Sequence, residues 1–160
     1  MRRLDLYRAF VEKWTHPQYR PVPATPDALD AVEREFKIAL PAAYREYMTN
    51  FGAGGPTSDL LHSIVEADLD THDLGQIYSP DGIGKMTTGW RRNGMPEELV
   101  AVAGDGMGNQ FCFHIGECGD MRKDDARVWF FDHDVLQAED TANGFEEWIR
   151  EFYEVHRVDA

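Results

Sequence analysis

The sequence predicts a single α+β domain, and three observations support this fold class. The length of 160 residues suits one domain with a sizeable core. Apolar residues at helical spacing dominate the first third and the end of the chain, whereas short alternating or uniformly apolar runs dominate the region between them. The composition, with 42% hydrophobic and 12% aromatic residues, is typical of a packed globule.

The first predicted element is an amphipathic helix over residues 3–15. The proline-rich segment over 16–24 is interpreted as a connector, and the core of the domain is assigned to 25–153. The apolar residues at helical spacing in the first element are Leu4, Tyr7, Val11 and Trp14.

Two further helices are expected before the strands begin. Thr25 and Pro26 form an N-cap followed by a first-turn proline, and the apolar stripe after them predicts a helix that ends near Ala39. Pro41 can open a third helix, and the glycines of "FGAGGP" suit a left-handed C-cap after it.

The middle of the chain is expected to alternate between strands and one weak helix. We interpret "LLHSIVEADL" as a strand and residues 83–90 as a helix diluted by Gly84 and Gly89. "LVAVA", "QFCFHI" and "ARVWFFD" predict three strands, the last an interior one because both of its faces are apolar. Apolar residues from Phe145 to Phe152 recur at helical spacing and predict a closing helix.

The glycine-rich loop "GDGMGN" is interpreted as a hairpin turn that holds no ligand. A dinucleotide loop needs a third glycine and then a helix, but Asn109 occupies that position and strand periodicity follows. No Walker lysine follows either, and an EF-hand counted from Asp105 would place Met107 and Gly116 at ligand positions. Asp105 and Asn109 are therefore expected to bond to loop amides, and no cofactor is predicted.

Neither a metal site nor a catalytic centre is predicted. Cys112 and His114 share one face of a strand and could be joined by His133, but this spacing is not diagnostic of zinc. Because Asp132 and Asp134 flank His133, we interpret it as a surface histidine with acidic neighbours. No GxSxG elbow occurs, and adjacent acidic pairs usually face water.

The charge balance favours a basic protein as partner. Sixteen Lys and Arg against twenty-nine Asp and Glu give a net charge of −13, which repels nucleic acid and anionic membranes. No apolar run is long enough to span a bilayer. Asp5 and Arg8 interrupt any secretory signal, so a cytoplasmic location is expected, with Cys112 and Cys118 reduced.

Four motifs, in order, resemble the SUKH superfamily and specifically its Smi/Knr-type domain: "LPAAYREYMTNFGAGG", "VAGDGMGNQFCFHI", "VWFFDHD" and "GFEEWIREF". The resemblance spans Thr25 to Phe152. Two positions depart from the family pattern, since Phe51 interrupts the usual Asn-Gly pair and Gly144 stands in a serine position. The residues that we assign to the structural family motif are Leu40, Pro41, Gly52, Asp105, Gly108, Asn109, Phe111, Phe113, Trp129, Asp132, His133, Phe145 and Trp148.

The resemblance implies helices packed on a mixed, mainly antiparallel sheet, and it brings no catalytic residues. Bacterial members look like immunity proteins that neutralise polymorphic or contact-dependent toxins by direct binding, whereas fungal relatives act as interaction and regulatory proteins. The expected function is therefore a non-catalytic immunity protein for a cognate toxin, with a basic nuclease as one toxin class that the charge fits. The alternative is a scaffold or regulator of an endogenous partner. The toxin and the oligomeric state stay open.

Two acidic surfaces are candidates for contact with a basic partner. The first is the segment "EADLDTHD", and the second follows the predicted strand "QFCFHI". Their candidate residues are Glu66, Asp68, Asp70 and Asp73 in the first surface, and Glu117, Asp120, Asp124 and Asp125 in the second.

Overall fold

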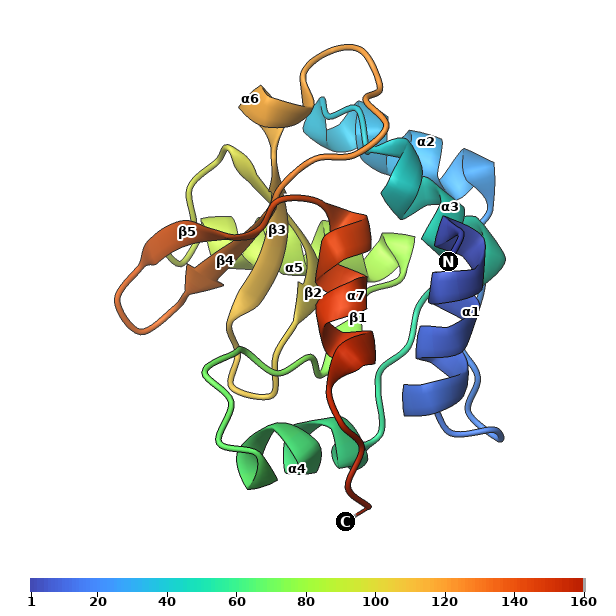
Figure 1. Cartoon of the computed structure of the whole chain (residues 1–160). Helices are drawn as coiled ribbons and strands as arrows, with labels where there is room; N and C mark the ends of the chain where they lie inside the picture. The colour runs from blue at the N-terminus through green and yellow to red at the C-terminus, as the bar shows by residue number, and fades with distance from the viewer. Residues whose placement is uncertain (160) are drawn as a thin grey trace.

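The computed structural model describes residues 1–159 and confirms the α+β class (Figure 1). The helices are α1 (Arg3–Trp14), α2 (Pro26–Phe36), α3 (Ala42–Asn50), α4 (Ser58–Glu66), α5 (Pro80–Arg91), α6 (Ile115–Cys118) and α7 (Phe145–Glu154). The strands are β1 (Gln76–Ile77), β2 (Leu99–Gly104), β3 (Gln110–His114), β4 (Val128–Asp132) and β5 (Gln137–Ala142).

The five strands form one sheet in the order β1-β2-β3-β4-β5, and every pairing is antiparallel. The sheet is therefore a meander, and the parallel pairing that a mixed sheet would contain is not found among the described strands. The connections explain this, because residues 105–109 and 133–136 are too short for the crossover that parallel neighbours require.

Helices cover both faces of the sheet. In Figure 1, α7 and α1 lie on one side, with α7 in front of the strands, while α5 lies behind them. All six residues of β2 are buried, as expected for a strand covered on both faces. The Thr87 hydroxyl of α5 accepts a hydrogen bond from the Ala101 backbone N–H at 3.0 Å, which fixes α5 against β2.

Aromatic side chains from distant segments form the core between α1, α3 and α7. Tyr7 and Tyr47 meet edge to face at 5.3 Å, and Tyr44 meets Phe113 of β3 in the same way at 5.2 Å. Phe145 contacts both pairs. Such edge-to-face contacts stabilise the packing by about 0.5–1.5 kcal/mol each beyond the area that they bury.

Arg3 ties the N-terminal helix to three other parts of the chain. Its guanidinium pairs with Glu46 on α3 at 3.4 Å, with Asp124 in the loop after α6 at 2.5 Å, and with Glu146 on α7 at 2.9 Å. The side chain of Arg3 is only 22% exposed, so these contacts lie partly out of water.

The prediction of a strand for "LLHSIVEADL" is wrong, because most of that segment belongs to α4. Its buried residues Leu60, Ser63 and Ile64 follow helical spacing, and the Ser63 hydroxyl donates to the Asp59 carbonyl one turn earlier. The other predicted helices and strands are confirmed, although α2 stops at Phe36. Lys37 ends it in the left-handed conformation.

None of the helices in residues 1–159 is long and apolar enough to cross a membrane.

Candidate functional site

The loop between β2 and β3 is a hairpin turn held by Asp105. One carboxylate oxygen accepts hydrogen bonds from the backbone N–H groups of Met107 and Asn109 at 2.8 and 2.9 Å. The other accepts from the Asn109 side-chain amide at 2.9 Å. Gly108 has a φ of +92°, which suits glycine. The loop amides thus bond to a carboxylate of the same loop, and the arrangement is that of a structural turn.

His133 lies beside this turn. Its backbone N–H donates to the side-chain oxygen of Asn109 at 3.1 Å, and its Nδ1 lies 2.7 Å from the same oxygen. Its Nε2 lies 3.3 Å from a carboxylate oxygen of Asp134. Together with Asp132, these side chains place three potential metal ligands within 4.8 Å. Both ring nitrogens already face protein oxygens, however, and Asp132 accepts a bond from the Asp134 N–H.

Other residues of the family motif build the fold. Gly52 has a φ of +90°, and a Cβ there would lie 1.9 Å from the Val22 carbonyl oxygen, so only glycine fits. Leu40 donates its N–H to Glu33 and accepts from Arg122, which places Pro41 at the N-cap of α3. The motif residues Phe111, Phe113, Phe145 and Trp148 are buried in the core.

The first acidic surface follows α4 and presents three exposed carboxylates. Glu66, Asp68 and Asp70 are exposed, and no cation among the described residues pairs with them. Asp73 is half-buried and accepts a bond from the Gly106 N–H at 3.2 Å, which holds the segment against the hairpin turn. Three of the four predicted residues are therefore free to meet a partner.

In the second acidic surface, three of the four carboxylates already have partners within the chain. Glu117 accepts from the Trp129 indole at 2.7 Å, and Asp124 pairs with Arg3. Asp125 accepts from the backbone N–H groups of Phe145 and Glu146 at 2.8 and 3.2 Å, so it caps α7. Burial raises the pKa of Asp125, and this effect outweighs the lowering by those hydrogen bonds.

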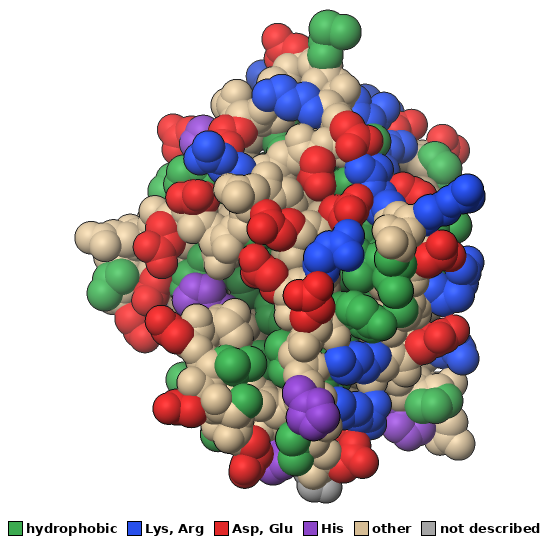
Figure 2. Space-filling view, viewed as in Figure 1, with side chains coloured by type: hydrophobic (Ala, Val, Ile, Leu, Met, Phe, Trp, Pro, Cys, Tyr) green, Lys and Arg blue, Asp and Glu red, His purple; other side chains and the backbone are tan. Residues whose placement is uncertain are grey.

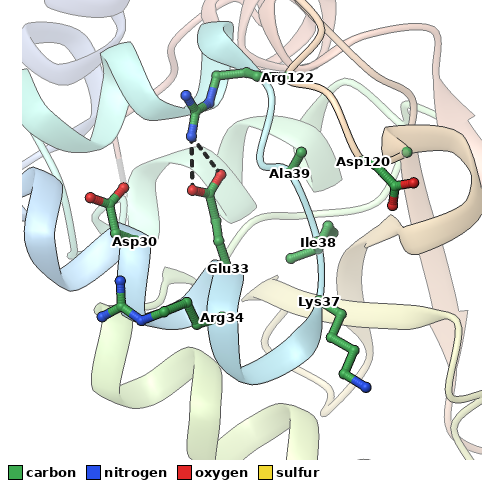
Figure 3. Close-up of a pocket in the computed structure, with 9 residues that line it drawn as sticks. Asp30, Glu33, Arg34, Lys37, Ile38, Ala39, Asp120 and Arg122 are labelled. Atoms are coloured by element: carbon green, nitrogen blue, oxygen red, sulfur yellow. Dashed lines mark hydrogen bonds and ion pairs between the residues drawn. The ribbon is translucent and has the colours of Figure 1, made fainter.

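Asp120 lines a cavity of about 500 Å³ beside α2. Figure 3 shows Asp120 across this cavity from Glu33, which pairs with Arg122 at 2.8 Å. Glu33 also pairs with Arg45 at 3.0 Å. Glu33 is only 14% exposed and pairs with both guanidinium groups, and Arg45 also pairs with Asp30 at 2.9 Å, so Glu33 supports the structure of this wall.

The two predicted surfaces do not form one site. In Figure 1, α4 lies at one end of the molecule, while α6 and the loop after it lie at the opposite end. A single small partner domain that contacts one surface would have to reach across the molecule to contact the other.

The first surface continues into an acidic groove that the sequence analysis missed. We define the acidic groove by Asp70 and His72 from the loop after α4, Glu139 and Thr141 from β5, and Glu151 and Glu154 from α7. They line a cavity of about 700 Å³. Figure 2 shows acidic side chains gathered over β5 and α7, whereas Lys and Arg are concentrated on the side that carries α1.

Glu151 in the acidic groove lies beside other carboxylates of α7. The pKa of Glu151 is raised, first by partial burial and then by its acidic neighbours Glu147 and Glu154. The described residues provide no cation to pair with Glu139, Glu151 or Glu154. A positive charge placed beside Glu151 would therefore stabilise its charged carboxylate.

The architecture and the surface together define a class: an antiparallel α+β domain that presents unpaired carboxylates in a groove. The family comparison is more specific, because the model of the SMI1 / KNR4 family (SUKH-1) matches residues 23–151. The chain therefore belongs to the SMI1 / KNR4 family (SUKH-1), as the four sequence motifs indicated. This family is consistent with a toxin-immunity role. A comparison with curated proteins gives no match.

Proposed function

We propose that this chain is a non-catalytic immunity protein that binds and neutralises a cognate toxin through an acidic surface. The observation that carries the proposal is the family match over residues 23–151, because SUKH-1 is generally a non-catalytic immunity family. Fold alone does not establish function, so the surface chemistry has to agree with it.

The surface chemistry favours a basic protein as the toxin. At a net charge of −13, the chain attracts cationic proteins over long distances and repels nucleic acid. A nuclease toxin, which must bind a polyanion, is a basic partner of this kind. We place the action of the protein in the cytoplasm, where such a toxin would find its substrate.

The test is co-expression with the product of the neighbouring gene, as the candidate toxin. We expect growth to be rescued and the two proteins to co-purify, whereas an unrelated protein of similar negative charge should rescue nothing. If the toxin still arrests growth when this chain is folded and abundant, the immunity role is refuted. A chain that fails to rescue growth but binds a defined endogenous protein would instead support the scaffold or regulator alternative.

A further inference from the structure

We propose that the acidic groove binds a lysine- or arginine-bearing segment of a protein partner, a proposal that rests on the proposed function for the partner's identity. The groove is the concave part of the acidic face, and three separate elements build it: the loop after α4, β5 and α7. Its place in the fold is therefore set by tertiary packing.

The charges of the acidic groove point to an occupant with several cations. Asp70, Glu139, Glu151 and Glu154 are exposed, and the described residues leave all four without a cationic partner. Among residues 1–159, the one group of three side chains close enough to hold a metal ion is Asp132, His133 and Asp134, none of which lines the groove. The groove carboxylates are spread more widely, which suits a segment that carries two or more basic side chains.

An apolar border beside the acidic groove suits the carbon stems of those side chains. A second cavity of about 380 Å³ shares Leu69, Thr71 and His72 with the groove. Leu61, Val65 and Leu69 are 46%, 66% and 43% exposed around it. Lysine and arginine carry methylene stems that cover apolar surface while their charged ends reach carboxylates.

His72 lines both cavities, and its ring is held in place by stacking. Its ring stacks on Phe130 of β4, with centroids 3.5 Å apart and planes 5° from parallel. Because Phe130 is only 5% exposed and belongs to β4, the His72 ring packs against the core of the domain. A bound segment would lie across His72, with its methylene stems over the apolar side chains of α4. Its cations would face the carboxylates of the groove and those of Asp68 and Asp73 in the second cavity.

The probe for the experiment is a lysine peptide of about ten residues, which extends over roughly 33 Å at about 3.3 Å per residue. Binding is measured by calorimetry and by amide chemical shifts of the full chain. The groove variant is Glu139→Gln with Glu151→Gln and Glu154→Gln. The matched control is Glu12→Gln with Glu97→Gln and Glu98→Gln, which changes the net charge equally at exposed carboxylates outside the groove.

We expect chemical shifts to concentrate in residues 69–72, 139–141 and 151–155. The groove variant should bind about tenfold more weakly at low salt, and the control should bind almost as tightly as the native chain. Equal weakening in both variants, or shifts spread over the whole acidic face, would mean generic charge attraction and would overturn the proposal. So would shifts that depend on protein concentration without peptide, which would identify a second copy as the occupant.

The failure of this inference can be told apart from the failure of the proposed function. A groove that binds the peptide in a chain that rescues no growth would refute immunity and leave the groove assignment standing. A chain that rescues growth equally well with and without the three groove substitutions would show that immunity uses another surface.

Discussion

At the scale of single residues, Asp125 shows that a carboxylate in an acidic segment can be structural. The segment 117–125 looks like a run of solvated charge, yet Asp125 bonds to the Phe145, Glu146 and Ala126 N–H groups. Gly144 precedes α7 and has no side chain that could do this.

We therefore predict that Asp125→Ala lowers the free energy of unfolding by about 1–2 kcal/mol, because two N–H groups at the start of α7 lose their acceptor. Urea denaturation measures this. Asp120→Ala is the control, since Asp120 is exposed and has no bonded partner in the described chain. Equal loss in both variants would contradict the capping role.

Two glycines should respond to alanine in opposite directions. Gly52→Ala forces a Cβ against the Val22 carbonyl at a positive φ, and should cost more than about 2 kcal/mol or prevent folding. Gly89 lies within α5 with nothing within 4 Å of an added Cβ, so Gly89→Ala should stabilise by about 0.5–1 kcal/mol. Thermal unfolding of both variants tests the contrast, and a stabilising Gly52→Ala would refute this account of the turn.

At the scale of elements, a helix or strand can be predicted from sequence when its own residues carry a capping signal or a periodic apolar pattern. α2 carries Thr25 as N-cap, whose hydroxyl accepts from the Ala28 N–H at 3.1 Å, and an apolar stripe follows. In α4 the apolar pairs Leu60-Leu61 and Ile64-Val65 lie one helical turn apart, a spacing that the short apolar run concealed. β5 is an edge strand in which only Ala142 is buried, so it has no alternating apolar pattern. It forms because its backbone pairs with β4.

The N-terminal helix lies outside the family match, which begins at residue 23, yet it is joined to the rest of the chain by Arg3. The guanidinium lowers the pKa of Asp124 and Glu146 below their ordinary values of 3.8 and 4.5. Since the folded-state pKa values are depressed, this stabilisation is present above those ordinary values and is lost as the pH falls through the lower folded values.

Arg3→Met should therefore lower stability by about 1 kcal/mol near pH 7, because the pairs are partly exposed, and the difference from the native chain should shrink below about pH 4. Denaturation across this pH range measures it. Arg8→Met is the matched control, since the Arg8–Asp5 pair is 53% and 56% exposed. A stability difference that stays constant with pH would mean that Arg3 acts through packing of its stem alone.

At the scale of the whole molecule, composition predicted the acidity of the surface but not the acidic groove. Glu151 and Glu154 lie about one turn apart on α7, and only the packing of α7 beside β5 brings them to the same cavity as Glu139 and Asp70. A run of acids can be recognised in the sequence, whereas charges that gather through tertiary packing have no local signal.

The net charge of −13 predicts how association with a basic toxin depends on salt. Raising ionic strength from about 0.05 M to 0.5 M should slow association by about tenfold or more and change dissociation much less, because screening acts on long-range attraction. Stopped-flow fluorescence separates the two rates. Association that is insensitive to salt would mean that apolar contacts guide the encounter.

The cap of α7 also constrains how this sequence can vary. A Cβ on Gly144 would lie 2.7 Å from a carboxylate oxygen of Asp125, so a side chain at 144 and the carboxylate at 125 compete for the same space at the same amides. A serine at position 144, as in the family pattern, could cap α7 in place of Asp125. Its Cβ would also clash with the Asp125 carboxylate in its present position. Positions 125 and 144 should therefore change together during evolution, each recording which of the two closes the start of the last helix.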